Sequence, residues 1–238
     1  MVGELVMEVE AIKTSLFKLN DSLIEFIKNH ISLLEDGDIL VVTSKIVALA
    51  EGRVNKIEDK EQIIKSEAKE IIKTPWTDLT LSERGWEINA GVDESNADEG
   101  LILLPKDSWQ SAEKLQTELK EKFRVKNLGV IISDTKSVPL RIGTVGRAIG
   151  CAGFLPTKSY VGKEDLYGRK SRVTISNMAD ALATSAVLMM GEGDEQTPLV
   201  IIKNAPVSFT DKSLNEKDKE LNLSPEQDIF SYVYRRGG

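Results

Sequence analysis

The chain has 238 residues, of which 41% are hydrophobic and 29% are charged, a balance typical of a folded globular protein and too apolar for a disordered one. Its formal net charge of -7 argues against nucleic acid as the main partner, because phosphate backbones recruit basic surfaces. A single cysteine, Cys151, excludes an internal disulfide and a cysteine-rich zinc site, and the lack of a signal sequence or of an apolar run of about 18 residues predicts a cytoplasmic protein with no membrane contact.

The first part of the chain alternates predicted strands and helices. Residues 6–12 alternate apolar and polar side chains and predict a strand, whereas 22–34 repeat apolar residues at helical spacing. Residues 39–42 predict a short buried strand. Residues 59–73 have a narrow apolar stripe and predict a polar amphipathic helix.

The second part continues with short strands at irregular intervals. The expected elements are a turn at 89–91, a strand at 101–104, a helix at 111–122, a strand at 128–133, a helix at 175–190 and a strand at 199–202. This order indicates an α+β fold rather than a doubly wound parallel sheet.

A glycine-rich stretch at 141–154, RIGTVGRAIGCAGF, has two interpretations. Its backbone amides could approach phosphate groups, or it could form a core helix with small packing residues. It is not a Walker A loop, because the Lys-Ser/Thr ending is missing. Arginines gather around it and would supply bidentate donors for phosphate or carboxylate groups: Arg141, Arg147, Arg169 and Arg172.

Oxygen-bearing side chains gather at three ends of predicted elements. They are Asp93, Glu94 and Asn96 before the strand at 101, Asp134 and Thr135 after the strand at 128–133, and Glu192, Asp194 and Glu195 after the helix at 175–190. Carboxylates with a hydroxyl nearby are the ligands that Mg²⁺ or Mn²⁺ prefers, and two such ions can clamp the phosphates of a nucleotide. Each acid taken singly favours a helix cap or a surface position over a metal ligand, so this pattern alone leaves the metal site open.

Five sequence segments, in this order along the chain, carry a family resemblance: GDILVVTSKIVALAEGR, NAGVDESN, VIISDTKSVPLRIGTVGRAIGCAGF, DLYGR and LMMGEGDEQTPLVII. Together they resemble the coenzyme F-420-0:L-glutamate ligase family of CofE-like proteins. The resemblance implies a CofE-like α+β fold with mixed, largely antiparallel sheets in two interwoven parts. The N- and C-terminal segments would form one part and about residues 90–175 the other, and the chain would assemble as a homodimer.

The same resemblance implies a chemistry. The enzyme would ligate L-glutamate to the acidic tail of a pterin- or deazaflavin-type coenzyme with GTP or ATP, through an acyl phosphate and with two divalent ions, Mg²⁺ or Mn²⁺, and K⁺ as a further ion. It implies metal ligands at Asp93, Asp134, Thr135 and Glu192, and nucleotide contacts at Thr43, Ser44, Lys45, Asn96, Gly191, Gly193 and Asp194. We further expect Asp134 and Arg141 to act in catalysis, and Arg147 and Arg169 to bind the carboxylates of the substrates.

The chain departs from the family pattern at three places. Residues 136–141 read KSVPLR where the family usually has Phe-Gly-Arg-Pro-Trp-Arg, Leu49 stands where a lysine is usual, and residues 11–14 replace a Gly-Leu-Pro element. These departures favour folate as the acceptor, as in a branch that replaces folylpolyglutamate synthase. They also leave open a non-catalytic relative that binds a nucleotide or pterin as a sensor or regulatory subunit.

Overall fold

The computed structural model describes residues 6–94, 100–214, 221, 223–224, 226–230 and 232. Its helices are α1 (Leu23–His30), α2 (Ser44–Ala50), α3 (Lys60–Glu67), α4 (Ser108–Phe123) and α5 (Met178–Met190), with 3₁₀ turns η1 (Ile57–Asp59) and η2 (Asn89–Gly91). Its strands are β1 (Glu8–Ile12), β2 (Asp38–Thr43), β3 (Val54–Asn55), β4 (Glu70–Lys73), β5 (Asp78–Ser82), β6 (Gly85–Ile88), β7 (Leu101–Ile102), β8 (Leu128–Ser137), β9 (Thr144–Ala152), β10 (Thr157–Ser159), β11 (Ile175–Asn177) and β12 (Leu199–Lys203). The predicted α+β class, with mixed and largely antiparallel sheets, is confirmed.

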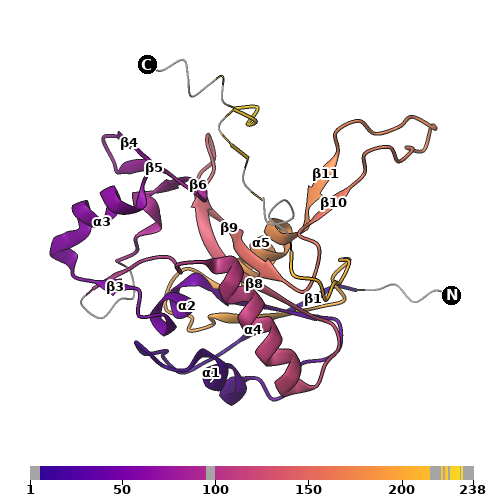
Figure 1. The fold of residues 1–238 in the computed structure, drawn as a ribbon, viewed down its shortest axis with the longest axis horizontal. Helices are drawn as coiled ribbons and strands as arrows, with labels where there is room; N and C mark the ends of the chain where they lie inside the picture. The colour runs from indigo at the N-terminus through magenta and orange to yellow at the C-terminus, as the bar shows by residue number, and fades with distance from the viewer. Residues whose placement is uncertain are drawn as a thin grey trace.

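A five-stranded sheet in the order β1-β12-β2-β8-β9 forms the centre of the fold (Figure 1). Its pairs are antiparallel except β2 with β8, which run parallel with Thr43 opposite Ser133. Because parallel strands point the same way, the residues that follow β2 lie beside the residues that continue β8. This edge of the sheet is where the polar motifs of the two strands meet.

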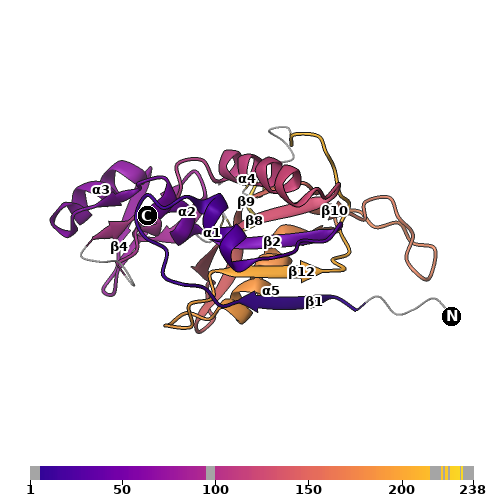
Figure 2. The ribbon, with the colours of Figure 1, turned by 90° about the horizontal axis from the view of Figure 1, so that it is seen from below.

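Helices cover both faces of this sheet, as Figure 2 shows from the side. In β2, Leu40 and Val42 pack with α1, α2 and α4, whereas Ile39 and Val41 pack with α5. This alternation follows from the period of two along a strand. Both faces are apolar, which explains why β2 and the first half of β8 have nearly continuous apolar sequences.

A three-stranded antiparallel sheet, β4-β5-β6, lies with α3 at one end of the molecule (Figure 1). The helix expected at 59–73 is therefore wrong in its last turn, since α3 ends at Glu67 and residues 70–73 form β4. Ile71 pairs with Thr80 of β5 in this sheet. A short apolar run suits either a helix or a strand, and here pairing with a later segment decides.

The glycine-rich stretch forms β9, so the interpretation of a core helix is wrong. A Cβ on Gly146 would come within 2.6 Å of the carbonyl oxygen of Ala183 in α5, and one on Gly150 within 2.4 Å of the carbonyl oxygen of Ser108 in α4. The glycines therefore let helices approach the strand closely.

The central sheet takes strands from the N-terminal, middle and C-terminal parts of the chain, with β8 and β9 beside β2. The division into two interwoven parts with boundaries near residues 90 and 175 stays a prediction. No helix within the described residues is long and apolar enough to cross a membrane.

Candidate functional site

A cavity of about 340 Å³ lies where β2 ends beside β8. Residues 14–17 form one wall, the junction of β2 with α2 another, and the loop at 190–198 after α5 a third. The Oγ of Ser133 lies 3.9 Å from the Sδ of Met190, which brings the end of α5 onto the edge of the sheet. Segments far apart in sequence thus enclose one space.

Most of the sequence-predicted site residues line this cavity. They are Thr43, Ser44, Lys45, Asp93, Asp134, Thr135, Gly191, Glu192, Gly193 and Asp194. Leu49, which stands where the family usually has a lysine, also lines it. Asn96 lies outside the described residues.

The predicted arginines do not line the cavity. Arg141 lies in the exposed turn between β8 and β9, and Arg169 lies in the segment between β10 and β11, where its side chain is exposed. Arg147 of β9 is buried. The catalytic role of Arg141 and the substrate contacts of Arg147 and Arg169 stay predictions.

The acids of the cavity are held by protein donors. The Nζ of Lys45 lies 2.8 Å from Oδ2 of Asp93. The hydroxyl of Ser44 donates to Oδ1 of Asp134 at 3.3 Å, and Nη2 of Arg147 lies 3.2 Å from its Oδ2. Burial raises the pKa of the Asp134 carboxyl, and the nearby guanidinium opposes this rise.

The charges of the other carboxylates in the cavity act on Glu192. Burial raises its pKa, and the charge of Asp134 raises this pKa further. Lys45 acts in the opposite direction, while Glu195 and Asp93 add to the rise. Negative charge therefore accumulates in the cavity beyond what the neighbouring lysine neutralises.

This donor set fits a hard divalent cation. Carboxylate and hydroxyl oxygens are the ligands that Mg²⁺ and Mn²⁺ prefer, and a cation would relieve the repulsion by Asp134 that adds to the effect of burial on the pKa of Glu192. Within the described residues no three acidic, histidine or cysteine side chains already stand as a coordination cluster. A cation bound by Asp93 would take the place that the Lys45 ammonium holds.

The loop after α5 is fixed by close contacts. Gly191 has a φ of 77°, and a Cβ there would lie 2.2 Å from Cδ of Glu195. The N–H of Gly193 donates to Oε2 of Glu195 at 2.7 Å, and Nζ of Lys13 donates to the Glu195 carbonyl at 2.6 Å. Gly191 therefore has a steric role in this loop, whereas Gly193 contributes its backbone N–H.

One residue near the cavity was missed by the sequence analysis. Glu87 of β6 is buried and forms an ion pair with Arg147. It lies in the short strand GWEI, in which no spacing or motif marks it.

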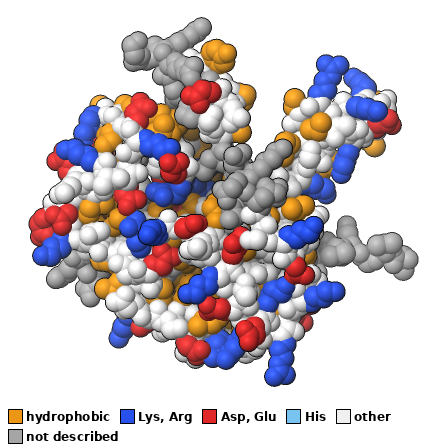
Figure 3. Space-filling model, viewed as in Figure 1, with side chains coloured by type: hydrophobic (Ala, Val, Ile, Leu, Met, Phe, Trp, Pro, Cys, Tyr) orange, Lys and Arg blue, Asp and Glu red, His pale blue; other side chains and the backbone are white. Residues whose placement is uncertain are grey.

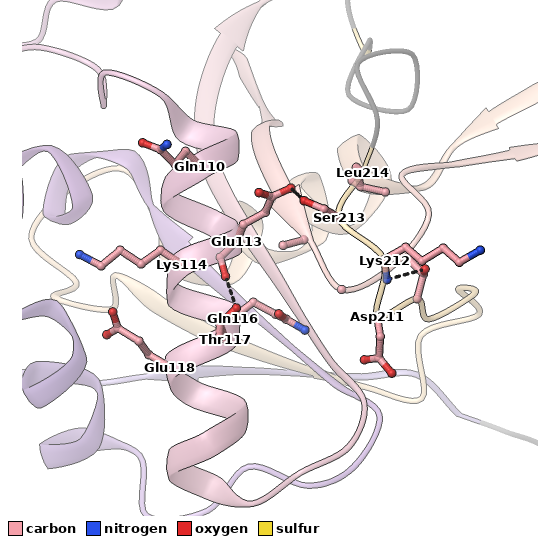
Figure 4. Close-up of a pocket in the computed structure, with 13 residues that line it drawn as sticks. Gln110, Glu113, Lys114, Gln116, Thr117, Glu118, Asp211, Lys212, Ser213 and Leu214 are labelled. Carbon is pink, nitrogen blue, oxygen red and sulfur yellow. Dashed lines mark hydrogen bonds between the residues drawn. The ribbon is translucent and has the colours of Figure 1, made fainter.

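A second hollow, of about 410 Å³, lies between α4 and residues 210–214 (Figure 4). Ser213 donates to Oε1 of Glu113 at 2.8 Å across it. Its lining is polar and mixed in charge, and it includes none of the sequence-predicted site residues. The chemistry suggested by the motifs therefore belongs to the cavity at the edge of β2 and β8.

Comparison with known proteins gives a consistent set of matches. The chain matches the family model described as F420-0:Gamma-glutamyl ligase in two overlapping segments, residues 11–78 and 59–204. It is 39% identical to the coenzyme F420:L-glutamate ligase of Methanocaldococcus jannaschii over 83% of this chain and 86% of that protein. It is 35% identical to the protein of the same name from Archaeoglobus fulgidus over 93% of this chain and 94% of that protein.

Proposed function

The chain belongs to the F420-0:γ-glutamyl ligase family, and from this membership we propose that it joins L-glutamate by an amide bond to the acidic tail of a deazaflavin- or pterin-type coenzyme. As a member of the family it is an amide-forming ligase. The proposal for this site rests on one observation: the junction of β2 with α2 at 43–45, Asp93, Asp134 and the loop after α5 all line one cavity.

The proposed reaction runs in two steps, because a carboxylate is a poor acylating agent. The acceptor carboxylate first attacks the γ-phosphorus of GTP or ATP, which gives an acyl phosphate and releases the nucleoside diphosphate. The amine of glutamate then attacks the acyl carbon, phosphate leaves with the C–O bonding electrons, and the amine loses a proton. No covalent enzyme nucleophile is needed, which agrees with the burial of Cys151.

The residues around the cavity take separate parts in this proposal. Asp93, Asp134, Thr135 and Glu192 would hold two divalent ions, Mg²⁺ or Mn²⁺, which would neutralise the phosphate oxygens. Thr43 at the end of β2, the first residues of α2 and the glycines after α5 would contact the nucleotide. K⁺ is proposed as a further ion on the family resemblance alone.

The test is a competition between acceptors. Purified protein receives L-glutamate, Mg²⁺, GTP or ATP, and folate together with the deazaflavin acceptor, and mass spectrometry identifies the products. Amide formation on either acceptor supports the proposal. A folded protein that forms no amide would overturn it, and tight nucleotide or pterin binding without turnover would identify a non-catalytic relative.

The acceptor has two candidates. The names of the relatives favour the deazaflavin coenzyme. The altered loop at 136–141 and Leu49, which lines the cavity, favour folate. The competition experiment decides between them directly.

We also propose that the protein is a homodimer. Residues 157–177, here called the arm, extend away from the body of the molecule (Figure 1). Large apolar side chains are exposed on it, at Val161, Leu166, Tyr167, Val173 and Ile175. Such a concentration on a projecting element is typical of a contact surface. Figure 3 shows hydrophobic and basic side chains side by side on this projecting part of the molecule.

A further inference from the structure

Glu87 is a buried carboxylate that does not line the cavity. It lies on β6 and is only 6% exposed. Its Oε1 accepts hydrogen bonds from the hydroxyl of Ser82 and from Nε of Arg84, and its Oε2 accepts from Arg147 of β9. A buried charge is costly unless it is paired, and these contacts pair the Glu87 carboxylate with the guanidinium groups of Arg84 and Arg147.

Arg147 lies between Glu87 and the cavity. It is 5% exposed and sits opposite Asp134 in the pairing of β9 with β8. Its Nη2 bonds both to Glu87 and to Oδ2 of Asp134, the latter at 3.2 Å. One guanidinium nitrogen thus serves two carboxylates, while Nε has no hydrogen-bond partner within the described structure.

Because Arg147 is shared between Glu87 and Asp134, the charge of Asp134 is affected. A guanidinium divided between two carboxylates neutralises each of them only in part. Asp134 therefore keeps negative charge toward the cavity, while its Oδ1 is oriented by the hydroxyl of Ser44. If Glu87 lost its charge, the positive charge of Arg147 would no longer be shared and would act on Asp134 alone. Arg147 would then compete with any other cation for the Asp134 carboxylate.

We propose that Glu87 is a positioning residue of the ligase site, which acts through Arg147 on Asp134. This rests on the proposed function, since Asp134 is there a ligand of a divalent ion. Outer residues that orient metal ligands change metal affinity by about 10–100-fold when they are replaced. Glu87 also links the three-stranded sheet to the central sheet, since β6 approaches the paired strands β8 and β9 (Figure 1).

The test measures binding of Mn²⁺ alone, without nucleotide or turnover, by the electron paramagnetic resonance signal of the free ion. Glu87→Gln removes the charge at nearly constant shape and should raise the Kd for Mn²⁺ about tenfold. Glu87→Asp keeps the charge but withdraws it from Arg147 on a shorter side chain, so it should raise the Kd by a smaller but still measurable factor. Glu83→Gln is the matched control, because Glu83 lies on the turn between β5 and β6 but pairs with Lys69 at the surface.

Kinetics give a second measurement. The Mg²⁺ concentration at half-maximal rate should rise in Glu87→Gln, while kcat at saturating Mg²⁺ stays near the wild-type value. Thermal unfolding without metal verifies that each variant is folded. A fall of kcat with an unchanged metal requirement would contradict a positioning role.

The outcomes separate the two proposals. Wild-type protein that binds no Mn²⁺ would overturn the metal part of the proposed function and this inference with it. Wild-type binding together with an unchanged Kd in folded Glu87→Gln would overturn the role of Glu87 alone. If Glu87→Gln does not fold, an unchanged Kd in Glu87→Asp overturns that role.

Discussion

Asp134 combines a half-buried position with contacts to Ser44 and Arg147. From the sequence alone, replacement of Asp134 would be expected to cost little stability, because nothing in the sequence shows a partner for its side chain. The structure gives a different expectation, because removal of this carboxylate leaves Arg147 with Glu87 as its remaining acidic partner. Breaking a fully buried pair costs about 3–5 kcal/mol. The side chain of Asp134 is 22% exposed, so the cost should be smaller.

Asp134→Asn tests the contribution of this residue to activity and to stability. Amide formation should fall about 100-fold or more, because a proposed metal ligand loses its charge. The free energy of unfolding should fall by about 1–2 kcal/mol, because the partly exposed pair with Arg147 is broken. Product formation by mass spectrometry and urea unfolding measure the two effects. Glu61→Gln, on the exposed surface of α3, is the control, and an unchanged rate in Asp134→Asn would contradict the assignment.

At the scale of elements, β9 depends on glycine where helices cross it. A Cβ at Gly150 would lie 2.4 Å from the carbonyl carbon and oxygen of Ser108 and 2.8 Å from the backbone nitrogen of Trp109. These backbone atoms of the first turn of α4 cannot rotate away, so the strand and the helix would have to separate.

Gly150→Val should therefore lower the free energy of unfolding by about 3 kcal/mol, near the upper end of the usual cost of overpacking. Urea unfolding followed by circular dichroism measures the change. Thr144→Val places the same side chain at an exposed position of the same strand and should change stability little. Equal stability of the two variants would show that α4 can shift without cost.

The loops before β2 and β8 are joined by Asp36. Its Oδ1 accepts the backbone N–H groups of Lys126 at 2.8 Å and of Asn127 at 2.6 Å, and Nδ2 of Asn127 donates to Oδ2 at 3.0 Å. The backbone N–H of Asn127, followed by its side chain, lowers the pKa of Asp36. A carboxyl with a lowered pKa stabilises the fold above its unfolded pKa of about 3.9 and loses this contribution as the pH falls through its folded pKa.

Asp36→Asn should therefore be less stable than wild type at pH 7, and the difference should shrink as the pH falls below about 4. Urea unfolding of both proteins between pH 7 and pH 3 measures this difference. A difference that stayed constant to pH 3 would show that the charge of Asp36 does not contribute.

The sequence indicated the elements that have a strong local pattern. The apolar runs of β2 and β8 and the oxygen-bearing residues at their ends could be predicted, and the structure brings those residues around one cavity. The sheet β4-β5-β6 could not be predicted, because β4 depends on pairing with β5 rather than on its own apolar pattern. The place of Glu87 beside the site could not be predicted either, because its partner Arg147 lies 60 residues further along the chain.

At the scale of the whole molecule, the arm and the body differ in charge. The arm has the basic residues Lys158, Lys163, Arg169, Lys170 and Arg172 against Glu164 and Asp165, whereas the formal net charge of the chain is -7. A basic and apolar arm is thus complementary to the acidic body of a second copy of the same chain. A self-complementary contact of this kind, made twice about a two-fold axis, closes a dimer.

Loss of the exposed apolar residues at the end of the arm should therefore convert the protein to monomers. Leu166 and Tyr167 are 100% and 81% exposed, so Leu166→Ser with Tyr167→Ser removes apolar contact area without disturbing either core. Sedimentation velocity should show a dimer for wild type and a monomer for the double variant at the same concentration. Leu33→Ser, at an exposed position after α1 that is 62% exposed, is the control and should remain dimeric. A wild-type monomer would overturn the proposed homodimer, whereas a double variant that stays dimeric would place the contact on another surface.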